Sequence, residues 1–182
     1  MSTELRTVLP IPSGVTATVT DDEFVIKGKR GESHRKIDNP MVVVKVEGQE
    51  LVFTATRAKK PQKTIMNTLV AHAKNMLRGV QEGHLYKLKI CSGHFPMNVV
   101  VSGNEFVIKN FLGEKFPRKI TLKPGVAVKV AGTEVTVEAP DKELAGLTAA
   151  AIEQLTKIAN RDRRVFQDGI YITMKDGKEL TA

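Results

Sequence analysis

Short stretches near the start of the chain alternate between apolar and polar residues. This period of two is typical of half-buried strands in antiparallel sheets. It occurs at Val15, Ala17 and Val19, at Phe24 and Ile26, at Val42, Val44 and Val46, and at Leu51 and Phe53. After Lys59-Lys60-Pro61 the apolar spacing changes to three and four, which predicts a helix ending near residues 79–83. Its predicted apolar face comprises Ile65, Met66, Leu69, Val70, Ala73, Met76, Leu77 and Val80.

The chain repeats this pattern once. Residues 23–27, Glu-Phe-Val-Ile-Lys, return unchanged as residues 105–109, and Gln81-Glu82-Gly83 later matches Gln167-Asp168-Gly169. The offset grows from 82 to 86, as small loop insertions would produce. Two copies with so long a period predict two homologous domains, 1–90 and 91–182.

The second copy has predicted strands near residues 97–101, 106–108, 126–130 and 135–137. Pro140-Asp141 follows as a helix start. We expect the apolar face of that helix to comprise Leu144, Leu147, Ala151, Ile152, Leu155, Ile158 and Ala159. A closing strand follows each helix, at 85–90 and at 170–173, which makes residues 91–93 the expected hinge. The fold class is α+β, with each domain a mostly antiparallel sheet packed against one long helix.

Composition places the chain among folded, basic proteins. Hydrophobic residues make up 41% of its 182 residues and charged residues 26%, and the net charge is +8. A basic chain without an apolar run of membrane length or a signal peptide is expected in the cytoplasm with a polyanionic partner, most often a nucleic acid. Residues 1–91 carry a net charge of +6 and residues 92–182 one of +2, so charge does not identify the binding domain.

The sequence contains no catalytic or cofactor signature. No dinucleotide or phosphate-binding glycine loop occurs, and Gly28-Lys29-Arg30-Gly31 is interpreted as a hairpin turn. Cys91 is the only cysteine, and with His94 it forms a possible but unsupported nucleophile and base. We therefore predict no enzyme activity, no metal and no cofactor. His72 is expected to be packed, and His34 and His84 to be exposed.

Two basic clusters stand where the periodic patterns stop. Residues 109–119 combine four cations, a glycine and two aromatics, Phe111 and Phe116, in a predicted hairpin loop. That mixture suits folded RNA, but either Phe could equally be a core residue. The second cluster, at the end of the second helix, has three arginines within four residues, more than the helix dipole requires.

The second cluster belongs to a longer motif. The pattern Gln154-x-x-x-Ile158-x-x-Arg161-x-x-Arg164-x-Phe166-x-Asp168-Gly169-Ile170-Tyr171-Ile172-x-x-Lys175 resembles the C-terminal signature of the L-six family of large-subunit ribosomal proteins, in its archaeal form. The segments at 94–97 and 110–115 also resemble that family. The resemblance covers residues from about 8 to about 176.

The resemblance implies a structural role in the large ribosomal subunit, where the family binds ribosomal RNA near the stalk base and the sarcin-ricin loop. The second domain would make the main RNA contacts, and the first would face neighbouring proteins at the stalk base. Arg164 and Asp168 are expected to pair. An RNA-binding architectural protein outside the ribosome stays as the alternative. The RNA contacts carried over by position are His94, Lys109, Asn110, Lys115, Arg118, Lys119, Lys157, Asn160, Arg161 and Arg163.

Overall fold

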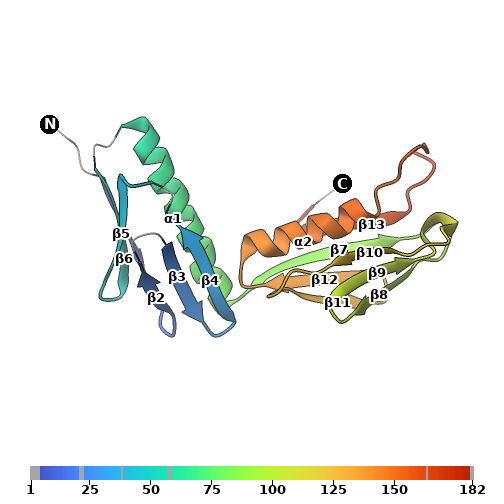
Figure 1. Cartoon of the computed structure of the whole chain (residues 1–182), viewed down its shortest axis with the longest axis horizontal. Coiled ribbons are helices and arrows are strands. Elements are labelled where there is room, and N and C mark those ends of the chain that lie inside the picture. Colours follow the sequence, from blue (N-terminus) through green and yellow to red (C-terminus); the bar gives the residue numbers. More distant parts are fainter. Residues whose placement is uncertain (1–4, 21–22, 38, 57–58, 163, 181–182) are drawn as a thin grey trace. The chain divides into compact units, whose positions relative to one another are not determined.

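The chain forms two compact units, Met1–Gly83 and His84–Ala182. The computed structural model describes residues 5–20, 23–37, 39–56, 59–162 and 164–180 (Figure 1). Within this part of the chain, each unit combines antiparallel strands with one α-helix. The predicted α+β class and the duplication are confirmed.

The first unit contains two three-stranded sheets. One has the order β1-β6-β5, formed by Leu5–Pro10, Glu50–Ala55 and Val42–Glu47. The other has the order β2-β3-β4, formed by Thr16–Val19, Glu23–Gly28 and Gly31–Lys36. All these pairs are antiparallel, and the predicted turn at residues 28–31 joins β3 to β4. The sequence pattern missed β1 and β4, in which polar residues interrupt the alternation.

Helix α1, Lys60–Gln81, supplies one side of the core of the first unit. The predicted apolar face is buried as expected, with Ile65 partly buried at its edge. Gly28 at the end of β3 lies against the last turn of the helix, since a Cβ there would be 2.7 Å from the carbonyl oxygen of Val80. A larger residue at this position would push sheet and helix apart.

The second unit has a three-stranded and a five-stranded sheet. Strands β10 (Arg118–Thr121), β9 (Glu105–Lys109) and β8 (Asn98–Ser102) form the first. The second has the order β11-β12-β7-β13-β14, formed by Ala127–Ala131, Glu134–Ala139, His84–Cys91, Gly169–Lys175 and Lys178–Glu179. Strand β10 and the short β14 were not expected from the sequence.

Helix α2, Lys142–Leu155, packs against this sheet (Figure 1). Asp141 caps it, accepting a hydrogen bond from the Glu143 backbone N–H at 2.8 Å. The predicted apolar face is wrong in part, because Leu147 is 55% exposed and residues 158 and 159 lie beyond the helix. Ile152 of the predicted face is buried, and the small residues Ala145, Thr148 and Ala149 make up the rest of the buried side. They allow a close approach to the sheet that larger side chains would prevent.

Strand β7 corrects the predicted organisation. Residues 85–90 were expected to close the first domain, but β7 lies between β12 and β13 in the sheet of the second unit. The division between the units therefore falls at Gly83 and His84, and the expected hinge at 91–93 lies inside the second unit.

His84 was expected to be exposed and is fully buried. Its Nδ1 lies 2.8 Å from Oδ1 of Asp176, whose other oxygen is 3.1 Å from Nζ of Lys142. Both partners lie far along the chain, so local sequence gave no sign of this burial. His34 is exposed and His72 is half-buried, as predicted, and His72 also has a hydrogen bond to Arg35 at 3.0 Å.

None of the described helices has the length and apolar character needed to cross a membrane.

Candidate nucleic-acid interface

Two loops lie together at one end of the second unit (Figure 1). The β9–β10 loop comprises residues 110–117, and the α2–β13 loop comprises residues 156–168. We call this surface, with the neighbouring turn at residues 92–96, the loop end. The described residues of both basic clusters lie at or beside this surface, although strands β11 and β12 and helix α2 separate the two clusters along the chain.

The β9–β10 loop has an unusual backbone. Asn110 (φ 60°), Leu112 (φ 48°) and Gly113 (φ 78°) all adopt left-handed conformations around a single 3₁₀ turn, Phe111–Gly113. Such conformations are rare outside glycine and asparagine, so Leu112 requires support from its surroundings. The Asn110 side chain supplies part of it by donating from Nδ2 to the Pro96 carbonyl oxygen at 3.1 Å. The loop therefore has a defined shape.

Arg118 joins the two loops. Its Nε donates to Glu114 at 2.8 Å, and its NH1 donates to the carbonyl oxygens of Leu155 at 2.7 Å and Lys157 at 3.2 Å. The guanidinium also lies 4.3 Å from the ring centre of Phe111, which is 1% exposed. A cation that bonds the last carbonyls of a helix stabilises its C-terminus. Arg118 thus holds the end of α2 against the β9–β10 loop and has little donor capacity left for a ligand.

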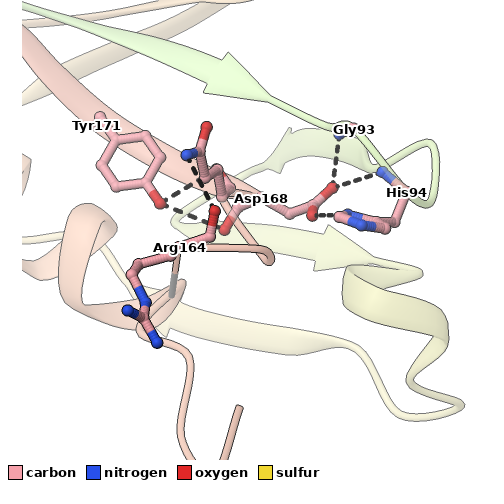
Figure 2. Close-up of polar contacts among 6 residues, drawn as sticks. Gly93, His94, Arg164, Asp168 and Tyr171 are labelled. Carbon is pink, nitrogen blue, oxygen red and sulfur yellow. Dashed lines mark hydrogen bonds and ion pairs between the residues drawn. The ribbon is translucent and has the colours of Figure 1, made fainter. Parts of the chain in front are cut away.

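Asp168 holds the turn that carries His94 (Figure 2). Its Oδ1 accepts from the backbone N–H groups of Gly93 at 2.6 Å and His94 at 2.9 Å, and its Oδ2 lies 2.5 Å from Nδ1 of His94. The Asp168 side chain is only 1% exposed. Burial by itself raises the pKa of this carboxyl, but the hydrogen bonds from His94 and Gly93 outweigh it and hold the pKa below its usual value. Asp168 is therefore a buried carboxylate that fixes the 92–96 turn.

A stack of flat groups continues from His94. The rings of His94 and Phe166 lie 4.8 Å apart with an interplanar angle of 31°, and the guanidinium of Arg161 lies 4.9 Å from the Phe166 ring centre. Aromatic and cation–π contacts of this kind orient the groups involved. Phe166 is half-buried and forms the middle layer of this stack.

The expected pair of Arg164 and Asp168 does not form. Arg164 instead bonds Asp162, with NH2 2.9 Å from Oδ2, and the Arg164 side chain is 90% exposed. Asp162 is two residues away on the same turn, whereas both oxygens of Asp168 are already occupied by the 92–96 turn.

The predicted contact residues fall into three groups. Lys119 has a partner in Glu105 at 3.6 Å, while Arg118 and His94 have the structural bonds described above. Arg163 lies outside the described residues. The remaining side chains are exposed at or beside the loop end, namely Lys109, Asn110, Lys115, Lys157, Asn160 and Arg161.

The two phenylalanines of the β9–β10 loop have opposite environments. Phe111 is buried in the core of the second unit, whereas Phe116 is 85% exposed beside Lys115. The sequence could not separate these alternatives. Pro117, which directly follows Phe116, favours an extended backbone at Phe116, but this does not decide whether the ring is buried.

This arrangement suits an anionic polymer. Exposed cations and amides on rigid loops contact phosphates and sugars, and an exposed aromatic ring offers a face for base stacking. Among the described residues, no group of three or more His, Cys, Asp and Glu side chains could hold a metal ion.

Comparison with known proteins gives a consistent result. The family model described as Ribosomal protein L6 matches residues 11–83 and 95–169, one segment in each unit. The chain is 45% identical over 176 residues to the large ribosomal subunit protein uL6 of Methanococcus vannielii, covering 97% of each chain. It is 43% identical over 168 residues to the protein of the same name from Methanospirillum hungatei JF-1, covering 92% of this chain and 96% of that relative.

Proposed function

Because the chain belongs to the ribosomal protein L6 family, we propose that it is a component of the large ribosomal subunit that binds ribosomal RNA through the loop end of its second unit. Members of this family are structural proteins rather than enzymes. The observation that carries the proposal is the exposed set of Lys115, Lys157 and Arg161 on two loops that Arg118 and Asp168 hold in place, with the exposed Lys109 beside them at the end of β9.

Binding would depend on the positions of the charged side chains and on the shape of the RNA surface. Lysine and arginine side chains neutralise phosphates and release counterions, so the affinity falls as the salt concentration rises. Rigid loops lose little conformational entropy on binding, which favours an RNA surface of matching shape. Asn110 and Asn160 both have left-handed backbone conformations and exposed side chains. Their amides would contact sugars or phosphates, although Nδ2 of Asn110 already donates to the Pro96 carbonyl oxygen.

We further propose a location near the base of the factor-binding stalk and the sarcin-ricin region. In this arrangement the second unit makes the main RNA contacts and the first unit faces neighbouring proteins of the stalk base. The support is the family resemblance together with the placement of both basic clusters on the second unit.

A salt titration tests the RNA interface. The full-length chain is titrated with a fragment of large-subunit ribosomal RNA over a range of salt concentrations. We expect Lys115→Ala to weaken binding to all RNA sequences tested and to reduce the slope of log K against log salt by about one, the effect of one lost phosphate contact. Lys157→Ala should do the same from the other loop.

Lys178→Ala is the matched control. Lys178 is an exposed lysine on β14, which pairs with the opposite end of β13 from the loop end. Its substitution should leave the slope unchanged. A slope that stays the same in both loop variants would remove the loop end from the interface.

Two experiments test the location. Crosslinking in intact ribosomes, followed by mapping of the joined nucleotides, should place the contacts of residues 109–119 and 157–161 in the proposed RNA region. If the chain instead acts as an RNA-binding protein outside the ribosome, it will separate from large subunits in a high-salt gradient. Continued cosedimentation excludes that alternative.

A further inference from the structure

Strands β1 and β7 occupy equivalent places in the two units. Leu9 pairs with Leu51 on β6, and Leu88 pairs with Val135 on β12. One residue beyond the paired residues, both strand pairs have an equivalent backbone hydrogen bond of 2.8 Å. It runs from Ile11 N to the Gln49 carbonyl oxygen in the first unit and from Ile90 N to the Thr133 carbonyl oxygen in the second. The two strands can therefore be aligned residue by residue. Arg6 corresponds to Leu85, Val8 to Lys87 and Pro10 to Lys89.

The two strands differ in their neighbours. Strand β7 has β12 on one edge and β13 on the other, whereas β1 pairs with β6 alone among the described strands. The second unit thus carries a closing strand on an edge that is open in the first unit.

The course of the chain explains the difference. In the second unit, Gln167-Asp168-Gly169 leads into β13, which returns along β7. In the first unit the matching residues, Gln81-Glu82-Gly83, lead into β7, which belongs to the other unit. The strand that would close the first unit is used as a central strand of the second.

The open edge presents backbone groups that can accept a strand. Hydrogen-bonded pairs alternate along an antiparallel ladder, so the bond from Ile11 to Gln49 places the backbone groups of Leu9 and Thr7 toward β6. Those of Arg6 and Val8 consequently face away from β6. In the second unit the residue equivalent to Arg6, Leu85, uses this direction to accept a bond from Asp176 N at 3.0 Å.

We propose that the open edge of β1 binds an extended segment of a neighbouring protein, which pairs antiparallel with β1 as β13 pairs with β7. Only a peptide backbone offers the alternating donors and acceptors that this edge requires. The segment would place an apolar residue on the helix side opposite Leu9, as β13 does with Ile172, which pairs with Leu88 and packs against the core. Pro10 has no N–H, so the ladder ends there. That the neighbour is a protein of the large subunit rests on the proposed function, whereas the geometry of the β1 edge does not depend on that function.

Hydrogen exchange resolved at single amides tests this proposal. Large subunits are purified from cells in which this chain replaces the cells' own copy of the protein. Amide exchange rates in these subunits are compared with those in the free chain. We expect the amides of Arg6 and Val8 to exchange at least about tenfold more slowly in subunits than in the free chain. The amides of Thr7 and Leu9 should be slow in both. Equal rates for Arg6 and Val8 in both states would overturn the proposal.

A photocrosslinking amino acid at position 6 identifies the occupant. A crosslink to an extended segment of another protein supports the proposal, whereas a crosslink to RNA alone or to a second copy of this chain overturns it. Val8→Pro removes the outward N–H but no bond to β6, and Val8→Thr keeps the N–H in a β-branched residue. The crosslink should fall at least about tenfold in Val8→Pro subunits and persist in Val8→Thr subunits. Since the salt titration concerns the second unit only, either proposal can fail without the other.

Discussion

At the loop end, residues of the same chemical type have different tasks, and their surroundings decide which. Arg118 and Arg161 both lie in basic clusters, yet Arg118 bonds two backbone carbonyls and a carboxylate, whereas Arg161 is exposed on the face of Phe166. His94, a candidate RNA contact, also has a structural bond to Asp168. A cluster of cations in a sequence therefore contains both ligand-binding and structural members, and only the contacts separate them.

Asp168→Asn tests the buried carboxylate. The pKa of Asp168 is lowered in the folded chain, so its contribution to stability is fully present above the unfolded value of about 3.9 and is lost as the pH falls through the folded value. We expect the variant to lose about 2–4 kcal/mol of unfolding free energy at pH 7, because a buried hydrogen-bonded charge is removed. The difference from the unsubstituted chain should shrink at pH values below about 3.9. Urea unfolding over this pH range measures it.

Asp162→Asn is the matched control for this measurement. Asp162 pairs with the exposed Arg164 on the surface, and such pairs contribute little to stability. A pH dependence as large as that of Asp168→Asn would show that burial of Asp168 is not the cause.

Phe116→Ala tests whether the exposed ring stacks on RNA. A ring that is 85% exposed contributes little to the fold, so the melting temperature should change little. If the ring stacks on a base, RNA affinity should fall by about 1–3 kcal/mol, with the salt slope unchanged because no charge is lost. Phe116→Trp should retain the affinity. Equal affinities for the unsubstituted chain and the alanine variant would exclude stacking at this position.

Among the elements, strands and helices with a regular period of large apolar residues could be predicted from the sequence, and elements without such a period could not. Helix α1 buries the predicted face because its large apolar residues recur every three or four positions. Helix α2 packs through Ala145 and Ala149, and small residues give a weak periodic signal. Strands β4 and β10 carry mostly polar residues, and their pairing with β3 and β9 defines them.

Arg118→Ala tests how the end of α2 is held. The change removes bonds to Leu155, Lys157 and Glu114 and the contact with the Phe111 ring, so we expect a loss of about 2–3 kcal/mol in unfolding free energy. RNA affinity should fall because the loops are no longer held together. The salt slope should hardly change, since the guanidinium is already occupied. Thermal unfolding and salt titration of the same variant measure both effects.

Lys119→Ala, one residue along, is the control for Arg118→Ala. Lys119 is exposed with a partner at 3.6 Å, and its removal should change stability by no more than about 0.5 kcal/mol. A fall of about one in the salt slope of Arg118→Ala would make Arg118 a direct phosphate contact and contradict the structural role.

For the molecule as a whole, the duplication was visible in the sequence, whereas the point of division was not. Residues 85–90 follow the helix of the first copy, as residues 170–173 follow that of the second, so the repeat itself suggested that they close the first domain. The choice between the two sheets depends on long-range pairing with β12 and β13, which no local pattern encodes. The observed division also moves Lys87 and Lys89 into the second unit, so the two units each carry a net charge of +4 rather than +6 and +2. Net charge therefore does not identify the RNA-binding unit.

Fragments of the chain test this division directly. Residues 84–182 should fold alone, because they contain a complete core and the five-stranded sheet. Residues 91–182, the domain predicted from the sequence, lack the central strand and with it the buried side chains of Tyr86, Leu88 and Ile90. Each such side chain stabilises a fold by about 1.5–3 kcal/mol, so their loss removes an amount comparable with the whole stability of a small domain. Circular dichroism and urea unfolding should show a cooperative transition for 84–182 and none for 91–182. Equal transitions in both would mean that β7 is dispensable to the second unit, and the division at Gly83 would then be wrong.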